Sequence, residues 1–258
     1  MADDKQQQPS ANKQSQFPSE IIDLPTKGKL YPENHPLRGG KIEVKYMTAK
    51  EEDILTSQNL IKKGIVIDRL LDSLIVTPGV TTDDLFLGDK NAIMVAARIL
   101  AYGPEYSVEL INPEDGEKVS HTFNLSELEY KEVPSEINNN EFEFELPVSK
   151  TKVTFKLLTG KDERIIEEEL KSLAKIGVGT SREITTRLKY VITSVDGNKE
   201  QSGITEFVQN MLSRDSLALR TKVSESTPDI ILKQEVDMGG ETTEVDIPMT
   251  VEFFWPST

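Results

Sequence analysis

Turn-forming pairs of residues divide this chain into short segments. Pro78-Gly79 and Gly103-Pro104 are combinations that end helices, whereas Asp115-Gly116 and Asp196-Gly197 are typical of tight turns. The segments between them carry either the apolar spacing of amphipathic helices or the alternation of half-buried strands. The sequence therefore predicts an α+β fold, in which helical bundles combine with small antiparallel hairpins and sheets.

The first half of this pattern begins with a predicted strand over residues 41–46. Thr48 and Glu51 have the capping-box spacing that begins a helix, and Gly64 is a natural residue to end it. A second helix is predicted from an apolar stripe on one face: Ile67, Leu70, Leu71, Leu74 and Ile75. A third helix should begin near Asp89 and stop at Gly103, before a hairpin.

The hairpin is expected over residues 105–125, and a second set of strands and helices follows it. Strand patterns lie near residues 142–146 and 153–157, and four helices are expected between Ile166 and Ser226. One of these helices has an apolar face formed by four residues: Ile184, Leu188, Val191 and Ile192. Further strand patterns close the chain, at 230–236 and 243–254.

The order of elements suggests two loosely similar halves, residues 41–135 and 141–258, and leaves open whether they share a fold. Residues 1–18 are polar and should be disordered, because they cannot bury enough apolar surface to fold. Residues 19–40 are expected to form an extended arm, since Pro25 and Pro32 favour extended backbone before them. The apolar anchors of this arm are Ile22, Leu24, Leu30 and Tyr31.

The arm allows two interpretations, which the sequence does not separate. Its anchors either close over the chain's own core or fill pockets on a neighbouring protein, as in the addition of a strand to a sheet edge. Tyr31 would be the main anchor in the second case, because aromatic residues dominate binding hot spots.

Composition excludes several classes of function. The chain has no cysteine and only two histidines, so disulfides, cysteine nucleophiles and thiolate metal sites are ruled out and no metal is expected. The formal net charge of −14 argues against binding to nucleic acid. No apolar run approaches the roughly 20 residues of a membrane span, and no secretory signal is recognisable. We therefore expect the chain to stay in the cytoplasm of the cell that makes it.

No motif in the sequence indicates catalysis. The densest acidic run, Asp162–Glu169, has the pattern of a solvated helix face, and the Asp115-Gly116 turn offers too few oxygen ligands for calcium. There is no phosphate-binding loop, nucleophile elbow or zinc-protease motif. We therefore expect a protein that is not an enzyme and has no cofactor or small-molecule substrate.

Several segments together resemble the baseplate hub protein family of T4-like bacteriophages. They are Leu24–Pro32, Tyr46–Ser57 with Leu60–Gly64, Gly88–Ala92 with Ala101–Tyr106, and Phe253–Pro256. Family members can carry cysteine knuckles in their two hairpins, but the matching positions here, Asn112–Glu117 and Val236–Gly240, contain none. The resemblance therefore implies hairpins formed without zinc.

The resemblance implies a structural or assembly protein of the viral tail baseplate, located in the virion and bound to other tail proteins. The main alternative is a dedicated assembly chaperone absent from the finished particle, and a third possibility is a hydrolase carried on the hub. The candidate partner-binding residues are those of the arm and of the C-terminal segment: Ile22, Leu24, Leu30, Tyr31, Phe253, Phe254 and Trp255.

Overall fold

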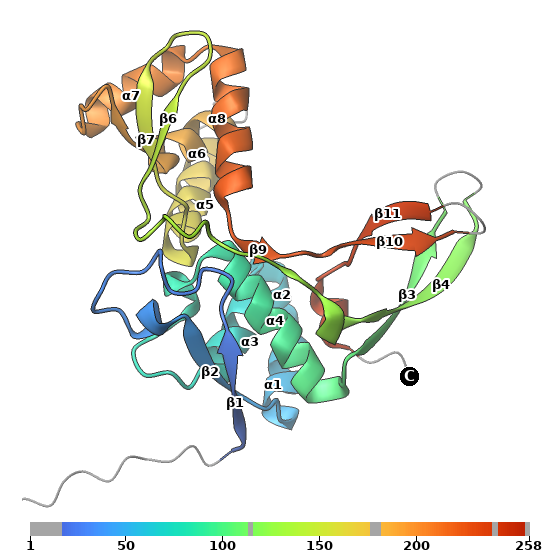
Figure 1. Cartoon of the computed structure of the whole chain (residues 1–258). Helices are drawn as coiled ribbons and strands as arrows, with labels where there is room; N and C mark the ends of the chain where they lie inside the picture. Colours follow the sequence, from blue (N-terminus) through green and yellow to red (C-terminus); the bar gives the residue numbers. More distant parts are fainter. Residues whose placement is uncertain (1–16, 113–115, 176–181, 239–241, 256–258) are drawn as a thin grey trace, which may run out of the picture.

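Figure 1 shows a computed structural model of the chain, which describes residues 17–112, 116–175, 182–238 and 242–255. Its helices and strands form three groups (Figure 1). The first lobe contains β1, β2 and α1–α4, and the second lobe contains β6–β8 and α5–α8. The third group, here called the hairpin pair, consists of β3–β4 and β10–β11. This arrangement confirms the predicted α+β class.

The arm enters the first lobe as a strand. β1 (Ser19–Asp23) pairs antiparallel with β2 (Lys41–Lys45), so that Ile22 lies opposite Ile42. Residues 1–16 of the predicted disordered tail lie outside the described residues.

The helix predicted from Thr48 to Gly64 is in fact two helices, α1 (Ala49–Leu55) and α2 (Gln58–Lys63). The break has a local cause. The Thr56 hydroxyl donates to the carbonyls of Glu52 and Asp53, and Ser57 adopts an extended conformation with ψ 100°. The predicted end is confirmed, since Gly64 is left-handed at φ 71°.

The apolar stripe forms α3 (Val66–Leu74), in which Leu70, Leu71 and Leu74 are fully buried. Ile75, the last residue of the predicted stripe, lies just beyond the helix, because its backbone is extended and forms a bridge with Val44 of β2. α4 (Leu87–Tyr102) begins two residues before Asp89 and ends at Gly103 as predicted.

The second lobe combines a three-stranded antiparallel sheet with four helices. The sheet order is β6 (Phe142–Glu145), β7 (Lys152–Phe155), β8 (Ile192–Val195). The helices are α5 (Gly160–Lys175), α6 (Glu183–Val191), α7 (Gln201–Asn210) and α8 (Ser213–Ser226). The prediction that Ile192 lies on a helix was wrong: its extended backbone ends α6 and pairs with Phe155 of β7.

The hairpin pair brings together segments from both halves of the sequence (Figure 1). β3 (Glu105–Ile111) pairs with β4 (Lys118–Asn124), and β10 (Lys233–Asp237) pairs with β11 (Thr242–Asp246). Near the tips, Nδ2 of Asn112 donates to the carbonyl of Met238 over 3.2 Å. This bond lies next to the cysteine-free turns.

The last predicted strand, 243–254, ends early. β11 stops at Asp246, and residues Val251–Phe254 form the short 3-10 helix η4, which buries Phe253 and Phe254 completely. The ring of Phe253 packs edge-on against Tyr106 of β3 at 4.9 Å, so aromatic packing replaces strand pairing at this end of the chain.

The first lobe meets the second lobe, and the segment that follows α8, backbone to backbone at two glycines. A Cβ on Gly88 would lie 2.0 Å from the carbonyl oxygen of Pro228, and one on Gly160 would lie 2.2 Å from that of Thr82. A short pair of strands, β5 (Tyr130–Lys131) and β9 (Asp229–Ile230), runs beside this contact. The division of the chain into halves near residues 135–141 stays a prediction.

Candidate interaction surface

The structure places most of the predicted arm anchors inside the first lobe. Leu24, Leu30 and Tyr31 are buried in its core, and Ile22 is partly buried against that core. These buried side chains match the interpretation in which the arm closes over the chain's own core. The neighbouring Ile21, not singled out in the sequence, is 66% exposed on β1.

The arm is fixed by one buried carboxylate. Asp89, in the first turn of α4, accepts hydrogen bonds from the Tyr31 hydroxyl at 2.6 Å, the Thr26 hydroxyl at 2.8 Å and the Thr26 amide at 3.1 Å. Burial raises the pKa of Asp89 to about 6, although these hydrogen bonds act to lower it. Burial and the neighbouring Asp89 charge raise the pKa of the Tyr31 phenol, which is therefore neutral.

A second buried carboxylate holds the start of α1. Glu51 accepts hydrogen bonds from the Thr48 amide and hydroxyl, from Lys45 Nζ and from the Ser73 hydroxyl. Burial raises its pKa, but the hydrogen bonds from Ser73, Thr48 and Lys45 outweigh burial and hold the pKa at about 2. Asp89 and Glu51 thus each connect elements of the first lobe, and neither lines a cavity described below.

The C-terminal candidates divide in the same way. Phe253 and Phe254 are fully buried in the chain's own core, whereas Trp255 is 46% exposed. Among the predicted anchors, Trp255 is the one whose side chain is open to solvent to a large degree. It follows directly after η4.

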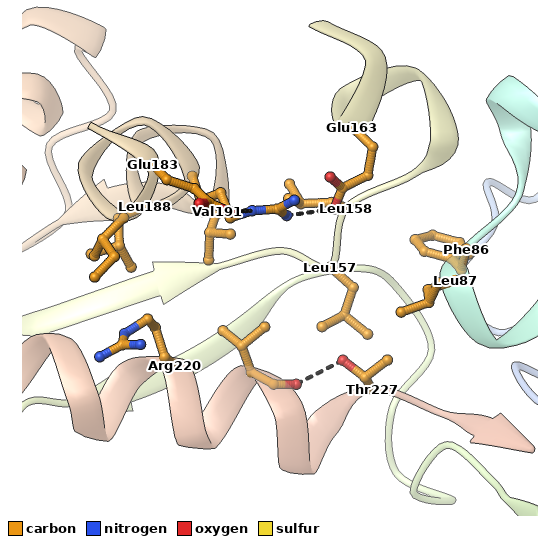
Figure 2. Close-up of a pocket in the computed structure, with 13 residues that line it drawn as sticks. Phe86, Leu87, Leu157, Leu158, Glu163, Glu183, Leu188, Val191, Arg220 and Thr227 are labelled. Atoms are coloured by element: carbon orange, nitrogen blue, oxygen red, sulfur yellow. Dashed lines mark hydrogen bonds and ion pairs between the residues drawn. The ribbon is translucent and has the colours of Figure 1, made fainter. Parts of the chain in front are cut away.

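A larger apolar surface lies where the two lobes meet. A cavity of about 340 Å³ lies between Phe86 and Leu87 at the start of α4, Leu157 and Leu158 before α5, and the facing sides of α6 and α8. Figure 2 shows the side chains that line it. A second cavity of about 550 Å³ continues toward β9 and β10, and it shares four lining residues with the first: Leu87, Arg220, Val223 and Thr227. We call the two cavities together the junction groove.

Apolar side chains are left open at this groove. Leu87, the first residue of α4, is 58% exposed, and Ile184, in the first turn of α6, is 49% exposed. Ile231 adds a third exposed aliphatic side chain in the second cavity. Together with Phe86 and Leu157 beneath them, these side chains give the groove a floor and rim that water solvates poorly.

The charged groups around the groove are unequally paired. Arg187 of α6 forms ion pairs with Glu163 at 2.7 Å and with Glu183 at 3.8 Å. Arg220 of α8 also lines the groove, but within the part of the chain that the structure describes it has no hydrogen bond or ion pair, and none is drawn to it in Figure 2.

Sequence reasoning did not find the junction groove. Ile184 was assigned to the same apolar helix face as Leu188 and Val191, and only the latter two are buried. The available signal was the position of Ile184, one turn ahead of the buried pair. Leu87 and Arg220 gave no signal, because the facing walls of the groove come from distant parts of the sequence.

The acidic run of α5 forms ion pairs with neighbouring basic residues. The carboxylates of α5 are paired: Asp162 with Lys156, Glu163 with Arg187 and Glu169 with Lys189. Over the described ranges, no group of three or more His, Asp or Glu side chains is placed to hold a metal ion. None of the helices in those ranges is long and apolar enough to cross a membrane.

A comparison with protein families identifies the chain. The model of the T4 bacteriophage base plate protein family matches residues 19–255, which covers both lobes and the hairpin pair. The chain belongs to this family. Comparisons with curated proteins and with solved structures returned no match. Family membership makes this a phage baseplate protein, and it confirms the resemblance drawn from the sequence.

Proposed function

We propose that this chain is a non-enzymatic structural component or assembly factor of the baseplate hub and acts by docking onto other tail proteins. The observation that carries the proposal is the junction groove, with Leu87 and Ile184 open to solvent on its rim. Burying a fully exposed aliphatic side chain contributes roughly 1.5–3 kcal/mol, and Leu87 and Ile184 are each about half exposed, so a partner that covers both gains about half of that amount from each. Membership of the base plate family supports a tail protein as that partner.

Leu87→Glu and Ile184→Glu test this proposal in the phage. Both positions lie in the first turn of a helix, α4 and α6, where an acidic side chain interacts favourably with the helix dipole. The variants should therefore fold while their grooves become unsuitable for an apolar partner. We expect phage carrying the double variant to produce few complete tails by electron microscopy.

The matched control is Ile61→Glu. Ile61 is also an exposed helical isoleucine, 38% accessible, but it lies on α2 away from the groove. Its variant should assemble tails as the parent does. Normal tail assembly by the Leu87→Glu/Ile184→Glu double variant would contradict docking through the groove.

In the alternative function, that of an assembly chaperone, the protein binds through the same surface but is absent from the finished particle. The net charge of −14 favours it, because an acidic chaperone can shield a basic partner before assembly. Quantitative mass spectrometry of purified virions separates the two functions. A subunit is present in a fixed ratio to other tail proteins, whereas a chaperone is absent. We expect the fixed ratio.

A further inference from the structure

The two sides of the junction groove differ in charge. On the α6 side, Arg187 is held by Glu163 and Glu183, so the local cation is already matched by carboxylates of this chain. On the α8 side, Arg220 has no such partner among the described residues. Lys131 of β5 lies on this side too, and its ammonium group donates to the carbonyl of Ser224.

Arg220 differs from the other arginines without a side-chain hydrogen bond or ion pair among the described residues, Arg69, Arg182 and Arg214, because it lines the junction groove. Arg220 stands beside Val223 and Leu87, so its guanidinium borders an apolar surface. A guanidinium at the edge of an apolar surface can form a bidentate hydrogen-bonded ion pair with a carboxylate, and this ion pair is stronger when water is excluded around it. Its position therefore favours an acidic ligand group.

We infer that the junction groove takes an aliphatic segment of another baseplate protein, with a carboxylate of that segment paired to Arg220. The inference rests on the proposed docking function and specifies its chemistry. The aliphatic side chains of the segment cover Leu87 and Ile184, and its acidic side faces α8. On the α6 side two carboxylates, Glu163 and Glu183, face one cation, Arg187. The second cavity, on the α8 side, is lined by three cations and two carboxylates: Lys131, Arg220, Lys233, Asp229 and Asp246. The balance of charge therefore favours an acidic group on the α8 side and orients the segment.

A second copy of this chain fits the groove less well than a different protein. Each copy carries a net charge of −14, so two copies repel each other outside the contact. The cavity between α6 and α8, about 340 Å³, has the size of a site for a few side chains of one segment. We therefore assign the groove to a different protein.

Site-specific cross-linking tests the inference with the full chain in infected cells. Ile184 is replaced by the photo-reactive residue p-benzoylphenylalanine, and the cross-linked peptide is sequenced by mass spectrometry. We expect a peptide of another baseplate protein that contains aliphatic residues and at least one Asp or Glu. Arg220→Glu should reduce the cross-link yield at least about tenfold, because it places like charges opposite each other.

Arg214→Glu is the matched control, because it makes the same charge change on α8 at an exposed residue that does not line the groove. It should leave the yield unchanged, and both variants should melt like the parent. Replacing the cross-linked carboxylate by lysine in the partner should restore the yield with Arg220→Glu.

Three results would overturn the inference: no cross-link, a cross-link to a second copy of this chain, or a yield unaffected by Arg220→Glu. These results are distinct from failure of the docking proposal. If Leu87→Glu/Ile184→Glu stops tail assembly and Arg220→Glu does not, docking through the groove stands and the role of the carboxylate is refuted.

Discussion

The hydroxyl of Tyr31 donates a 2.6 Å hydrogen bond to Oδ2 of Asp89, joining residues that are 58 positions apart in the chain. This bond attaches the arm to the first turn of the longest helix of the first lobe. Tyr31 also packs edge-on against Phe86, which lines the junction groove. The arm therefore supports the groove from beneath, although most of its own apolar anchors are hidden.

Tyr31→Phe should lower the free energy of unfolding by about 1.5–3 kcal/mol, because it removes a buried hydrogen bond to a charged group while keeping the ring. Urea denaturation followed by circular dichroism measures the change. Tyr46→Phe is the matched control, since its hydroxyl makes an exposed 3.3 Å contact with Glu20. Equal midpoints for the two variants would show that the Tyr31–Asp89 bond does not hold the arm.

Asp89→Asn should become more stable relative to the parent as the pH rises from 4 to 7. The folded pKa of Asp89 is about 6 and its ordinary value is 3.8, so the folded state binds the proton more tightly. The Asp89 carboxyl therefore makes the parent less stable as the pH rises through this range. The amide of the Asp89→Asn variant does not titrate, so the variant does not lose this stability.

The site can accept the side-chain amide of the Asp89→Asn variant without a clash of donors. Both groups that donate to Oδ2 are hydroxyls, of Tyr31 and Thr26, and a hydroxyl can also accept from the new NH₂ group. Denaturation curves of parent and Asp89→Asn at several pH values between 4 and 7 measure the difference in stability. A difference that stays constant or shrinks with rising pH would contradict the raised pKa.

Glu51→Gln should show the opposite dependence on pH. The folded pKa of Glu51, about 2, lies below its ordinary 4.5, so its stabilising contribution is complete above pH 4.5 and is lost as the pH falls toward 2. The variant should be less stable than the parent by about 1–3 kcal/mol at pH 7. The gap should narrow as the pH is lowered from 4.5 to 3.

Thr48→Ala removes the hydroxyl that donates to Glu51 and should cost about 1 kcal/mol. Its effect should not add fully to that of Glu51→Gln, because the two residues form one network. Full additivity in the double variant would show that Thr48 and Glu51 act independently.

Gly88→Ala and Gly160→Ala should each destabilise the chain by more than about 1 kcal/mol, because the new methyl group meets backbone oxygen at 2.0 Å and 2.2 Å. Gly39→Ala is the control, since nothing lies within 4 Å of a Cβ there. Thermal unfolding measures the effect. Melting temperatures close to that of Gly39→Ala would mean that the lobes do not touch at these glycines.

The sequence predicted the parts of the fold that depend on neighbours in the chain. Thr48, Glu51 and Gly64 lie at helix ends as their spacing indicated, and Leu70, Leu71 and Leu74 form a buried stripe. The break at Thr56 and Ser57 was not predicted, because it follows from side-chain bonds to backbone carbonyls that compete with the helix.

The junction groove was not predictable from such local patterns. Its walls include Leu87, Ile184 and Arg220, which are separated by long stretches of chain and meet through the contact at Gly88 and Gly160. Likewise, the sequence around the arm anchors Leu24 and Tyr31 is the same whether they pack into this chain's core or into a pocket of a neighbouring protein. Tertiary packing decides where these side chains lie, and the residue pattern of a single segment carries no information about that packing.

The walls of the junction groove belong to different lobes, Leu87 to the first and Ile184 to the second. A partner segment that contacts both walls stabilises the arrangement of the lobes to which it binds. Thermodynamic linkage makes this effect reciprocal. A change that stabilises the backbone contacts at Gly88 and Gly160 therefore also raises the affinity for the partner segment. A partner bound across both walls and a rigid contact between the lobes would therefore stabilise each other, without a change of fold.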